Sequence, residues 1–453
     1  MLIRFTVENC LSFNQRLDFN MIASDEARHR HHVVKGYSES DIALLRTSVI
    51  YGANEAGKSN LIKAMAFARE FILKGVEKNN SIEVVNFKLD QSCYQKSSRF
   101  EFEFRFKGKQ FAYGFSIDKS KVVEEWLFEI GHNLEIPLFE RDGQGIRFNF
   151  KHDMFRAISE KEKQRMDYEA DSTRKNLLFL TNCKERNIKW FNPVYEWFND
   201  CLTIMFPSSK VKFLPLILTN DTDIRVFFDN ILKLFGFHIN KMDVKTFEFE
   251  TLEIPVTLKK SIKKYFPYGK TGAIAIVSIG EDKSYIIQEQ AGNLKALELV
   301  IFRNNQEGEA IPFELLEESD GTRRIMDFIP MLVRLSKGDS VFVIDEIDRS
   351  LHVLLLKKLF DLILNNNMFK NVTSQLIAST HEIYLLDINR LLRKDEIWFI
   401  SKTNGESRAY SLANAEVDDL DLAKGYINGR FGAIPFIQDV TELGWENSAK
   451  TNT

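Results

Sequence analysis

The sequence predicts an α/β fold built around a parallel sheet, and three observations lead to this. Residues 47–59 (TSVIYGANEAGKS) combine a β-type run with a glycine-containing loop, and a helix-forming run follows from Asn60 to Phe71. A second apolar run in residues 341–346 (VFVIDE) ends in two carboxylates. Between them, residues 81–150 contain stretches in which aromatic and charged residues alternate with the period of a strand. Strand-loop-helix units of this kind occur in sheets that helices cover.

The loop of residues 52–59 fits the pattern G-x-x-x-x-G-K-[ST], which defines a P-loop. Its glycines let the backbone curl, so that successive N–H groups and the N-terminus of the next helix point at the phosphates of a nucleotide. We expect Lys58 to reach the β- and γ-phosphate oxygens and Ser59 to bind Mg²⁺. The sequence therefore predicts ATP and Mg²⁺ as cofactors. The residues predicted to contact the nucleotide here are Gly52, Asn54, Ala56, Gly57, Lys58, Ser59 and Asn60.

The apolar run that ends in Asp345 and Glu346 is typical of a Walker B strand. At the carboxyl end of the sheet, Asp345 would hold Mg²⁺ through water, and Glu346 would polarise the water that attacks the γ-phosphate. An apolar strand followed by two acids is common, and it becomes specific only together with the P-loop. The pair of motifs predicts that ATP is hydrolysed as well as bound.

Three further segments stand in a fixed order around this strand. Ser319 and Gly321 form a Ser-x-Gly turn that opens an apolar helix, residues 347–352 follow Glu346, and His381 ends a later β-type run. This order resembles that of ABC-type ATPases. The resemblance implies that Ser319 and Gly321 belong to a signature motif that binds the γ-phosphate held by the opposite protomer. It also implies a D-loop at residues 347–352 and a catalytic switch histidine at His381.

Segments at both ends of the chain resemble a narrower group of ATPases. Residues 1–13 resemble the first strand and turn of the AAA15/AAA21 group of bacterial ATPases, which are related to the RecF and OLD families, and residues 424–435 resemble that group's closing segment. The resemblance implies an ABC-type P-loop ATPase head with an antiparallel β arm and an inserted, mainly helical lobe. Two positions depart from the pattern. Glu55 stands where ABC enzymes often have glycine, and Gln91 is the one candidate for a Q-loop that is otherwise unassigned.

The same resemblance divides the chain into three segments. Residues 1–150 would form the N-terminal part of the head, residues 151–295 the helical insertion with a possible partner or DNA surface, and residues 296–453 the C-terminal part of the head. Within the arm, Phe100–Phe106 and Phe111–Ile117 flank a basic turn and predict a β-hairpin. The insertion is rich in aromatic residues, which are more often core or partner surface than a platform for stacked bases.

Composition limits the class of protein. The chain has 453 residues, a net charge of −3 and four cysteines without metal-type spacing, which favours reduced, partly buried thiols. No stretch approaches ~18 uninterrupted apolar residues, so we expect no membrane span. The N-terminus leads directly into a strand-like run, which predicts a cytoplasmic protein without a signal peptide.

Two basic clusters offer alternatives. Lysines at 259, 260, 263 and 264 would form one stripe on a helix, which is either a solvated face or a local DNA contact. The negative net charge does not indicate a protein that binds nucleic acid through its overall charge. Residues 28–32 (RHRHH) could bind phosphate or a metal. Their loop-like setting, without nearby Cys or Asp ligands, favours a polar surface loop.

No nuclease is expected within the chain. OLD-type relatives carry a TOPRIM domain after the ATPase, but residues 382–453 are too few for one. Asp419 and Asp421 imitate the D-x-D of such a site and lack the preceding glutamate strand. Any nuclease or toxin would then act in trans.

The resemblance implies a stand-alone ABC-type ATPase, in which ATP clamps the protomers of a dimer or higher homo-oligomer and hydrolysis resets them. In size and layout the chain is most similar to the AriA family, the sensor ATPases of the PARIS anti-phage system. That family would restrain an AriB-like effector of TOPRIM type and release it on sensing a phage-encoded trigger protein. Alternatives are a PtuA-like subunit of the Septu system, a RecF-like repair ATPase that binds DNA, and a scaffold without activity. The intact set Lys58, Ser59, Asp345 and Glu346 disfavours the last.

Overall fold

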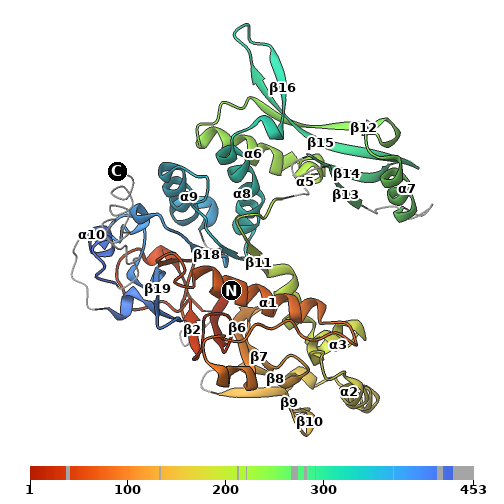
Figure 1. Ribbon diagram of the computed structural model, residues 1–453, viewed down its shortest axis with the longest axis vertical. Coiled ribbons are helices and arrows are strands. Elements are labelled where there is room, and N and C mark those ends of the chain that lie inside the picture. Colours follow the sequence, from red (N-terminus) through yellow and green to blue (C-terminus); the bar gives the residue numbers. More distant parts are fainter. Residues whose placement is uncertain are drawn as a thin grey trace, which may run out of the picture. The chain divides into compact units, whose positions relative to one another are not determined.

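The computed structural model divides the chain into two compact units, and Figure 1 shows their elements. The described residues are 1–36, 41–131, 134–211, 214–220, 222–266, 274–279, 283–290, 292–370, 372–415 and 422–431. The first unit comprises Met1–Phe206, Asp339–Ile347 and Thr373–Thr453, and the second comprises Pro207–Gly338 and Asp348–Val372.

A six-stranded sheet in the first unit has the order β11-β17-β18-β5-β19-β20. Neighbours are parallel except for the antiparallel pair of β19 and β20. The parallel sheet expected from the sequence is thus confirmed. Its strands are β5 (Thr47–Gly52), β11 (Leu202–Met205), β17 (Val341–Ile344), β18 (Gln375–Ser379), β19 (Ile397–Thr403) and β20 (Glu406–Ser411). Because β5, β17 and β18 run in one direction, the loops that follow them leave the sheet at the same edge.

A second, antiparallel sheet of the first unit has seven strands in the order β10-β9-β8-β7-β6-β1-β2. They are β1 (Leu2–Glu8), β2 (Leu17–Asn20), β6 (Ser98–Phe106), β7 (Lys109–Ile117), β8 (Val122–Ile130), β9 (Glu135–Asp142) and β10 (Gly145–Phe148). The predicted hairpin is β6 and β7. Its two turn residues, Lys107 and Gly108, have φ of 49° and 78°, the left-handed values of a tight hairpin turn. The antiparallel arm is therefore confirmed.

Helix α1 (Lys58–Lys74) joins the P-loop to this arm. The ring centroid of Phe67 in α1 lies 5.4 Å from that of Phe100. The ring centroid of Phe71, also in α1, lies 5.6 Å from that of Phe115. In Figure 1, α1 accordingly runs beside β6 and β7. The apolar face of the helix that carries the loop is thereby anchored on the sheet.

The aromatic-rich segment after residue 189 packs in the same core. Trp197, in a π-helical turn η5 (Trp197–Cys201), stacks on Phe104 with 4.1 Å between ring centroids. Phe191 and Phe198 are buried as well. These rings form core, whereas Trp190 of the same segment is half-buried. The neighbouring helices are α2 (Glu160–Ser172), α3 (Phe179–Glu185) and α4 (Asn192–Glu196).

A buried carboxylate connects α3 to the arm. Glu125 of β8 accepts the N–H groups of Phe179 and Leu180 at 2.7 and 3.0 Å, and it accepts the Tyr113 hydroxyl at 2.9 Å. The Arg141 guanidinium lies 3.6 Å away. Burial raises the pKa of Glu125, while these donors oppose that rise. Glu125 thus caps a helix that starts without a capping side chain of its own.

The second unit contains a five-stranded antiparallel sheet and helices. Strand order is β12-β15-β14-β13, and β16 pairs with β15. The strands are β12 (Lys241–Glu248), β13 (Ile274–Ile279), β14 (Lys283–Gln290), β15 (Asn293–Asn304) and β16 (Ala310–Glu314). The helices are α5 (Leu214–Asn220), α6 (Thr222–Leu234), α7 (Val256–Tyr265), α8 (Asp320–Lys337) and α9 (Val353–Asn365).

The expected insertion at residues 151–295 therefore contains strands as well as helices. Residues 151–206 group with the first unit, and residues 241–290 include three strands of the second. The β-branched Ile274, Ile276 and Val277 favour a strand there. The boundaries at 150 and 295 stay predictions.

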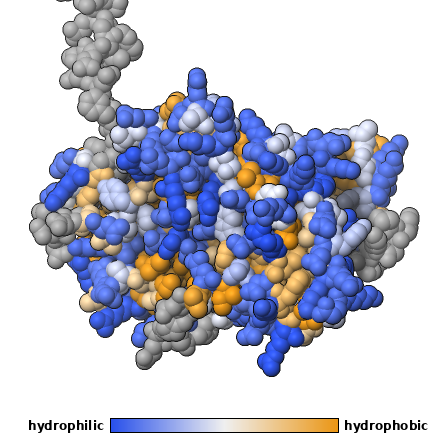
Figure 2. Space-filling model, turned by 90° about the horizontal axis from the view of Figure 1, so that it is seen from below, coloured by the Kyte–Doolittle hydropathy of each residue, from blue (hydrophilic) through white to orange (hydrophobic). Residues whose placement is uncertain are grey.

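The cysteines and the surface can be compared with what the composition predicts. All four cysteines are buried and free, as predicted. None of the helices in the described ranges is both long and apolar enough to cross a membrane. The face in Figure 2 is mainly hydrophilic, with hydrophobic residues in several separate patches.

Candidate nucleotide site

The loop between β5 and α1 has the backbone of a P-loop. Gly57, at the N-cap of α1, has φ of 117°, a value that side chains rarely allow. A Cβ at Gly57 would overlap the Ser407 hydroxyl, and one at Gly52 would lie 2.5 Å from the carbonyl oxygen of Ile400. Both predicted glycines are thus required by close approach of β19 and β20.

The Lys58 ammonium is buried at this loop. Its Nζ donates to the carbonyl oxygens of Gly52 at 2.7 Å and Ala53 at 3.0 Å. This fixes a positive charge beside the N-terminus of α1, where the helix dipole also favours an anion. The position suits an anionic phosphate chain.

Ser59 and Asp345 meet although 286 residues separate them. The Ser59 hydroxyl donates to Asp345 Oδ1 at 3.1 Å, and Asp345 is buried at the end of β17. A hydroxyl and a carboxylate oxygen are ligand types that Mg²⁺ prefers. The two residues predicted to bind Mg²⁺ are therefore adjacent and fit that ion.

Ser379 also contacts this pair, and sequence reasoning did not identify it. Its hydroxyl donates to Asp345 Oδ1 at 2.7 Å and accepts the N–H of Glu346 at 2.8 Å. Ser379 ends β18, which lies between β5 and β17. The signal was present in the β-type run before His381, but only the strand order shows which side chain faces the site.

Glu346 and His381 lie at the same edge of the sheet. Glu346 is partly exposed and has φ of 48°, a left-handed conformation that costs a non-glycine residue on the order of 1 kcal/mol and concentrates at functional sites. His381 is exposed two residues beyond Ser379. The structure thus brings the predicted base and the predicted switch residue to the edge that holds Lys58.

A second set of side chains braces the loop from outside. The Ser407 hydroxyl donates to the carbonyl oxygen of Ala56 at 2.6 Å and hydrogen-bonds with the Ser12 hydroxyl at 2.8 Å. Asn60 donates to the same Ser12 hydroxyl at 2.9 Å. Asn60, predicted to contact nucleotide, therefore has its amide in a structural bond. Ser12 and Ser407 carry no motif and were not predicted.

Two loop positions are exposed, whereas Ala56 is buried and Ala53 half-buried. Asn54 and Glu55 both face solvent, and Glu55 has φ of 64°. Glycine adopts that conformation most easily, which accounts for the resemblance's preference for glycine at this position. Gln91 is exposed at the start of a short 3₁₀ turn and gains no role.

The predicted signature lies in the second unit. Ser319 is the N-cap of α8, and its Oγ accepts the N–H of Thr322 at 3.2 Å. A Cβ on Gly321 would come 2.9 Å from the carbonyl oxygen of Ser350. Gly321 therefore lets the predicted D-loop approach the start of α8. Glu318 is also fixed there, by a 2.6 Å ion pair with Arg303.

Some predicted features cannot be placed. Asp419, Asp421 and residues 432–435 of the closing segment lie outside the described residues.

Comparison with solved structures finds a likeness to the SMC head domain from Thermotoga maritima. The two chains are 12% identical, with 92% of this chain and 99% of that chain covered and a TM-score of 0.39. That score reflects limited agreement between the backbones, and the fold assignment rests on the strand order described above. None of the curated proteins matches the chain.

The sequence itself matches a protein family. Residues 48–387 match the family described as "AAA domain, putative AbiEii toxin, Type IV TA system". The matched range includes the P-loop, Asp345, Glu346 and His381. The chain therefore belongs to this AAA-domain family of P-loop ATPases.

Proposed function

We propose that the chain is an ABC-type ATPase that hydrolyses Mg²⁺-ATP and thereby controls a separate effector protein in bacterial anti-phage defence. The observation that carries the enzymatic part is the contact of Ser59 with Asp345, with Ser379 bonded to the same carboxylate oxygen. Such convergence of three segments on one oxygen fits a cation site beside a phosphate loop.

Each residue has a distinct task in this proposal. Lys58 and the first N–H groups of α1 hold the phosphate chain, and Mg²⁺ when bound neutralises part of its charge. Glu346 accepts a proton from the attacking water. Ser379 holds the Asp345 carboxylate and the Glu346 backbone in fixed positions. His381 contacts the γ-phosphate side of the site.

Ser319 and Gly321 complete the site of a second protomer. The N-terminus of α8 carries a partial positive charge, and the Ser319 hydroxyl lies at that end. A homodimer with two shared ATP sites follows, and ATP is the bridging ligand.

The effector function rests on the family's link to toxin–antitoxin systems and on the AriA-like layout. A protein partner is favoured over DNA because lysines of the stripe on α7 are bonded to other groups of the protein. Lys263 pairs with Glu250 at 2.6 Å, and Lys259 donates to the carbonyl oxygen of the same residue at 2.7 Å. Half of the stripe is thus bonded within the protein.

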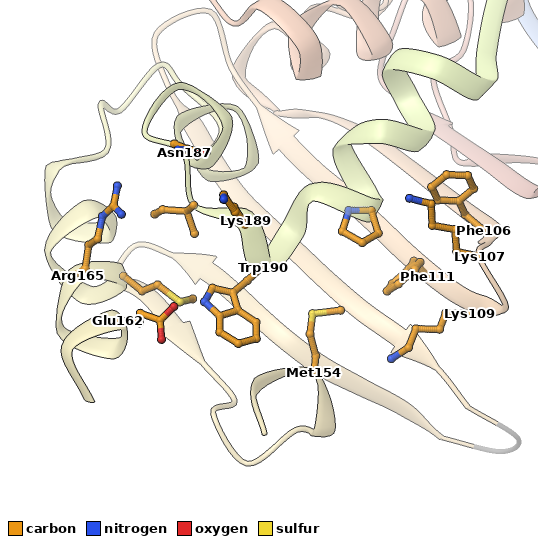
Figure 3. Close-up of a pocket in the computed structure, with 13 residues that line it drawn as sticks. Phe106, Lys107, Lys109, Phe111, Met154, Glu162, Arg165, Asn187, Lys189 and Trp190 are labelled. Atoms are coloured by element: carbon orange, nitrogen blue, oxygen red, sulfur yellow. The ribbon is translucent and has the colours of Figure 1, made fainter. Parts of the chain in front are cut away.

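A surface for the partner is offered by a pocket of about 790 Å³ in the first unit. Figure 3 shows Trp190 and Met154 in its middle, with Arg165 on one side and Lys109 on the other. Two basic lining residues are paired within the protein, Lys107 with Glu196 at 2.8 Å and Lys109 with Glu129 at 2.7 Å, and Glu162 adds an acidic group. The aromatic and aliphatic lining suits a partner segment that inserts an apolar side chain.

The test uses the purified full chain and the protein encoded beside it. We expect Mg²⁺-dependent ATP hydrolysis by the chain alone, without cleavage of DNA or RNA. With the neighbouring protein we expect a stable complex whose release requires hydrolysis and is lost in Glu346→Gln. Trp190→Ala should weaken that complex while leaving ATP hydrolysis unchanged. Nuclease activity of the chain alone would overturn the proposal that the effector is a separate protein. Salt-sensitive DNA binding without any protein partner would favour the RecF-like alternative.

A further inference from the structure

Three histidines of residues 28–32 form a cluster that the nucleotide site does not use. A potential ligand atom of each of His29, His31 and His32 lies within 4.8 Å of the other two. The polar surface loop predicted here holds for Arg30 and His31, which are exposed, and is wrong for His32, which is 0% exposed. The segment reaches into the fold because Glu396, 364 residues away, pairs with His32.

Local backbone geometry brings the rings together. His29 has φ of 48° and precedes a 3₁₀ turn, η1 (Arg30–His32). In such a turn side chains three residues apart lie on the same side. The rings of His29 and His32 accordingly stack at 5.0 Å, and the ring of His31 meets that of His32 edge-on at 4.5 Å.

Bonds from outside the cluster orient two of the rings. Nδ1 of His32 lies 3.0 Å from Glu396 Oε1, and both side chains are fully buried. A carboxylate on one imidazole nitrogen is the usual partner of a histidine that binds a metal through the other nitrogen. His29 hydrogen-bonds to the backbone of Ile388, and its Nε2 is buried without a hydrogen-bond partner among the described residues. A buried polar atom in that state favours a ligand.

We propose that His29, His31 and His32 bind a divalent transition-metal ion of the zinc class through three imidazoles. Imidazole-only sites suit zinc, copper or nickel and exclude Mg²⁺ and Ca²⁺, which require oxygen ligands. Tetrahedral zinc with bonds of ~2.0 Å places its nitrogen ligands roughly 3.3 Å apart. The ligand atoms must therefore approach one another by up to about 1.5 Å, and the half-buried His29 and exposed His31 side chains supply that movement.

Nearby charges are compatible with a cation. Arg28, in the same segment, donates to Glu26 at 2.9 Å and to Asn389 at 3.2 Å. Glu396 brings a carboxylate to the cluster. The buried Arg46 guanidinium interacts electrostatically with the same carboxylate.

The role that fits this position is structural. The carbonyl oxygen of His32 accepts the N–H of Arg46 at 2.9 Å, one residue before β5, and Glu396 immediately precedes β19. Strands β5 and β19 are parallel neighbours, so the cluster lies at their amino ends and Lys58 follows the carboxyl end of β5. The metal would clamp the start of both strands and would not contact nucleotide.

The test measures metal binding and thermal unfolding of the untagged full chain after chelation and desalting. We expect one equivalent of Zn²⁺ per chain, a rise in Tm of several degrees, and visible absorption bands with Co²⁺ as a spectroscopic substitute. His31→Ala and, separately, His29→Ala should lower zinc affinity at least ~10-fold. His238→Ala, an exposed histidine of the second unit, is the matched control and should bind as wild type.

A positioning role for Glu396 is tested by Glu396→Gln, which should weaken Zn²⁺ binding while the unligated fold persists by circular dichroism. Lys58→Ala should retain zinc, which separates this site from nucleotide binding. Less than ~0.1 equivalent bound by wild type, or wild-type zinc affinity in both histidine variants, would overturn the proposal.

Discussion

Ser379 bonds to both halves of the acidic pair: its hydroxyl donates to Asp345 at 2.7 Å and accepts the backbone N–H of Glu346 at 2.8 Å. Because β18 lies between β5 and β17, one small side chain positions the predicted Mg²⁺ ligand and the predicted base together.

Replacement of this serine should slow hydrolysis more than it weakens binding. A hydrogen bond to a charged group contributes about 1.5–3 kcal/mol, so Ser379→Ala should lower kcat ~10-fold or more. Steady-state ATPase assays check this. Ser48→Ala is the control, since the buried Ser48 hydroxyl of β5 has no hydrogen-bond partner among the described residues. Turnover within about twofold of wild type would contradict the positioning role.

Loss of the Lys58 ammonium should abolish nucleotide binding. It removes the buried cation at the loop, and we expect affinity for a fluorescent ATP analogue to fall by ~100-fold or more in Lys58→Ala. Lys63→Ala removes an exposed lysine from the same helix and should bind as wild type. Unchanged affinity in a folded Lys58→Ala protein would rule out the P-loop assignment.

Glu346→Gln should bind ATP and hydrolyse it ~10²-fold or more slowly, because an amide cannot accept the proton of the attacking water. Trapped ATP should also raise the fraction of dimer in analytical ultracentrifugation. Glu70→Gln changes an exposed glutamate of α1 and serves as the control for loss of charge. If Glu346→Gln keeps normal turnover, another residue is the base.

Shared sites can be tested by mixing two inactive variants. Ser319→Asp keeps the N-cap hydrogen bond of α8 but places a negative charge where a phosphate would bind, whereas Ser319→Asn keeps the cap without the charge. Ser319 is preferable to Gly321, whose substitution would disturb Ser350. Mixed with Lys58→Ala, Ser319→Asp should recover roughly a quarter of wild-type activity, since half of the dimers are mixed and each holds one intact site. No recovery, with mixed dimers proven by native mass spectrometry, counts against shared sites.

Stability of the arm should depend on Glu125. Glu125→Ala removes the cap of α3 and leaves Arg141 without its buried partner, so the free energy of unfolding should fall by about 3 kcal/mol or more. The neighbouring Glu124→Ala, on an exposed side chain, should cost about 0.5 kcal/mol or less. Urea unfolding, monitored by tryptophan fluorescence, compares the two variants. Equal losses of unfolding free energy would contradict the capping role of Glu125.

The sequence was informative where one short segment contains the whole pattern. The P-loop, the strand before Asp345 and the hairpin after Ser98 each depend on a pattern within about twenty consecutive residues, and each takes its expected form. Ser12, Ser379 and Ser407 could not be predicted, because a lone serine has no signal until strand order places it. The same limit applies to His32, whose burial depends on Glu396.

Strand β5 also constrains how the protein can be made. Its two partners, β18 and β19, lie more than 300 residues later in the chain, and every residue of β5 is buried in the finished fold. At roughly 5–20 residues per second, synthesis of the next ~350 residues takes about 20–70 s. For that time the ribosome carries an apolar strand with both edges unpaired, a state that promotes aggregation. Expression yield should therefore depend on chaperones and on translation speed more than the stability of the folded chain would suggest.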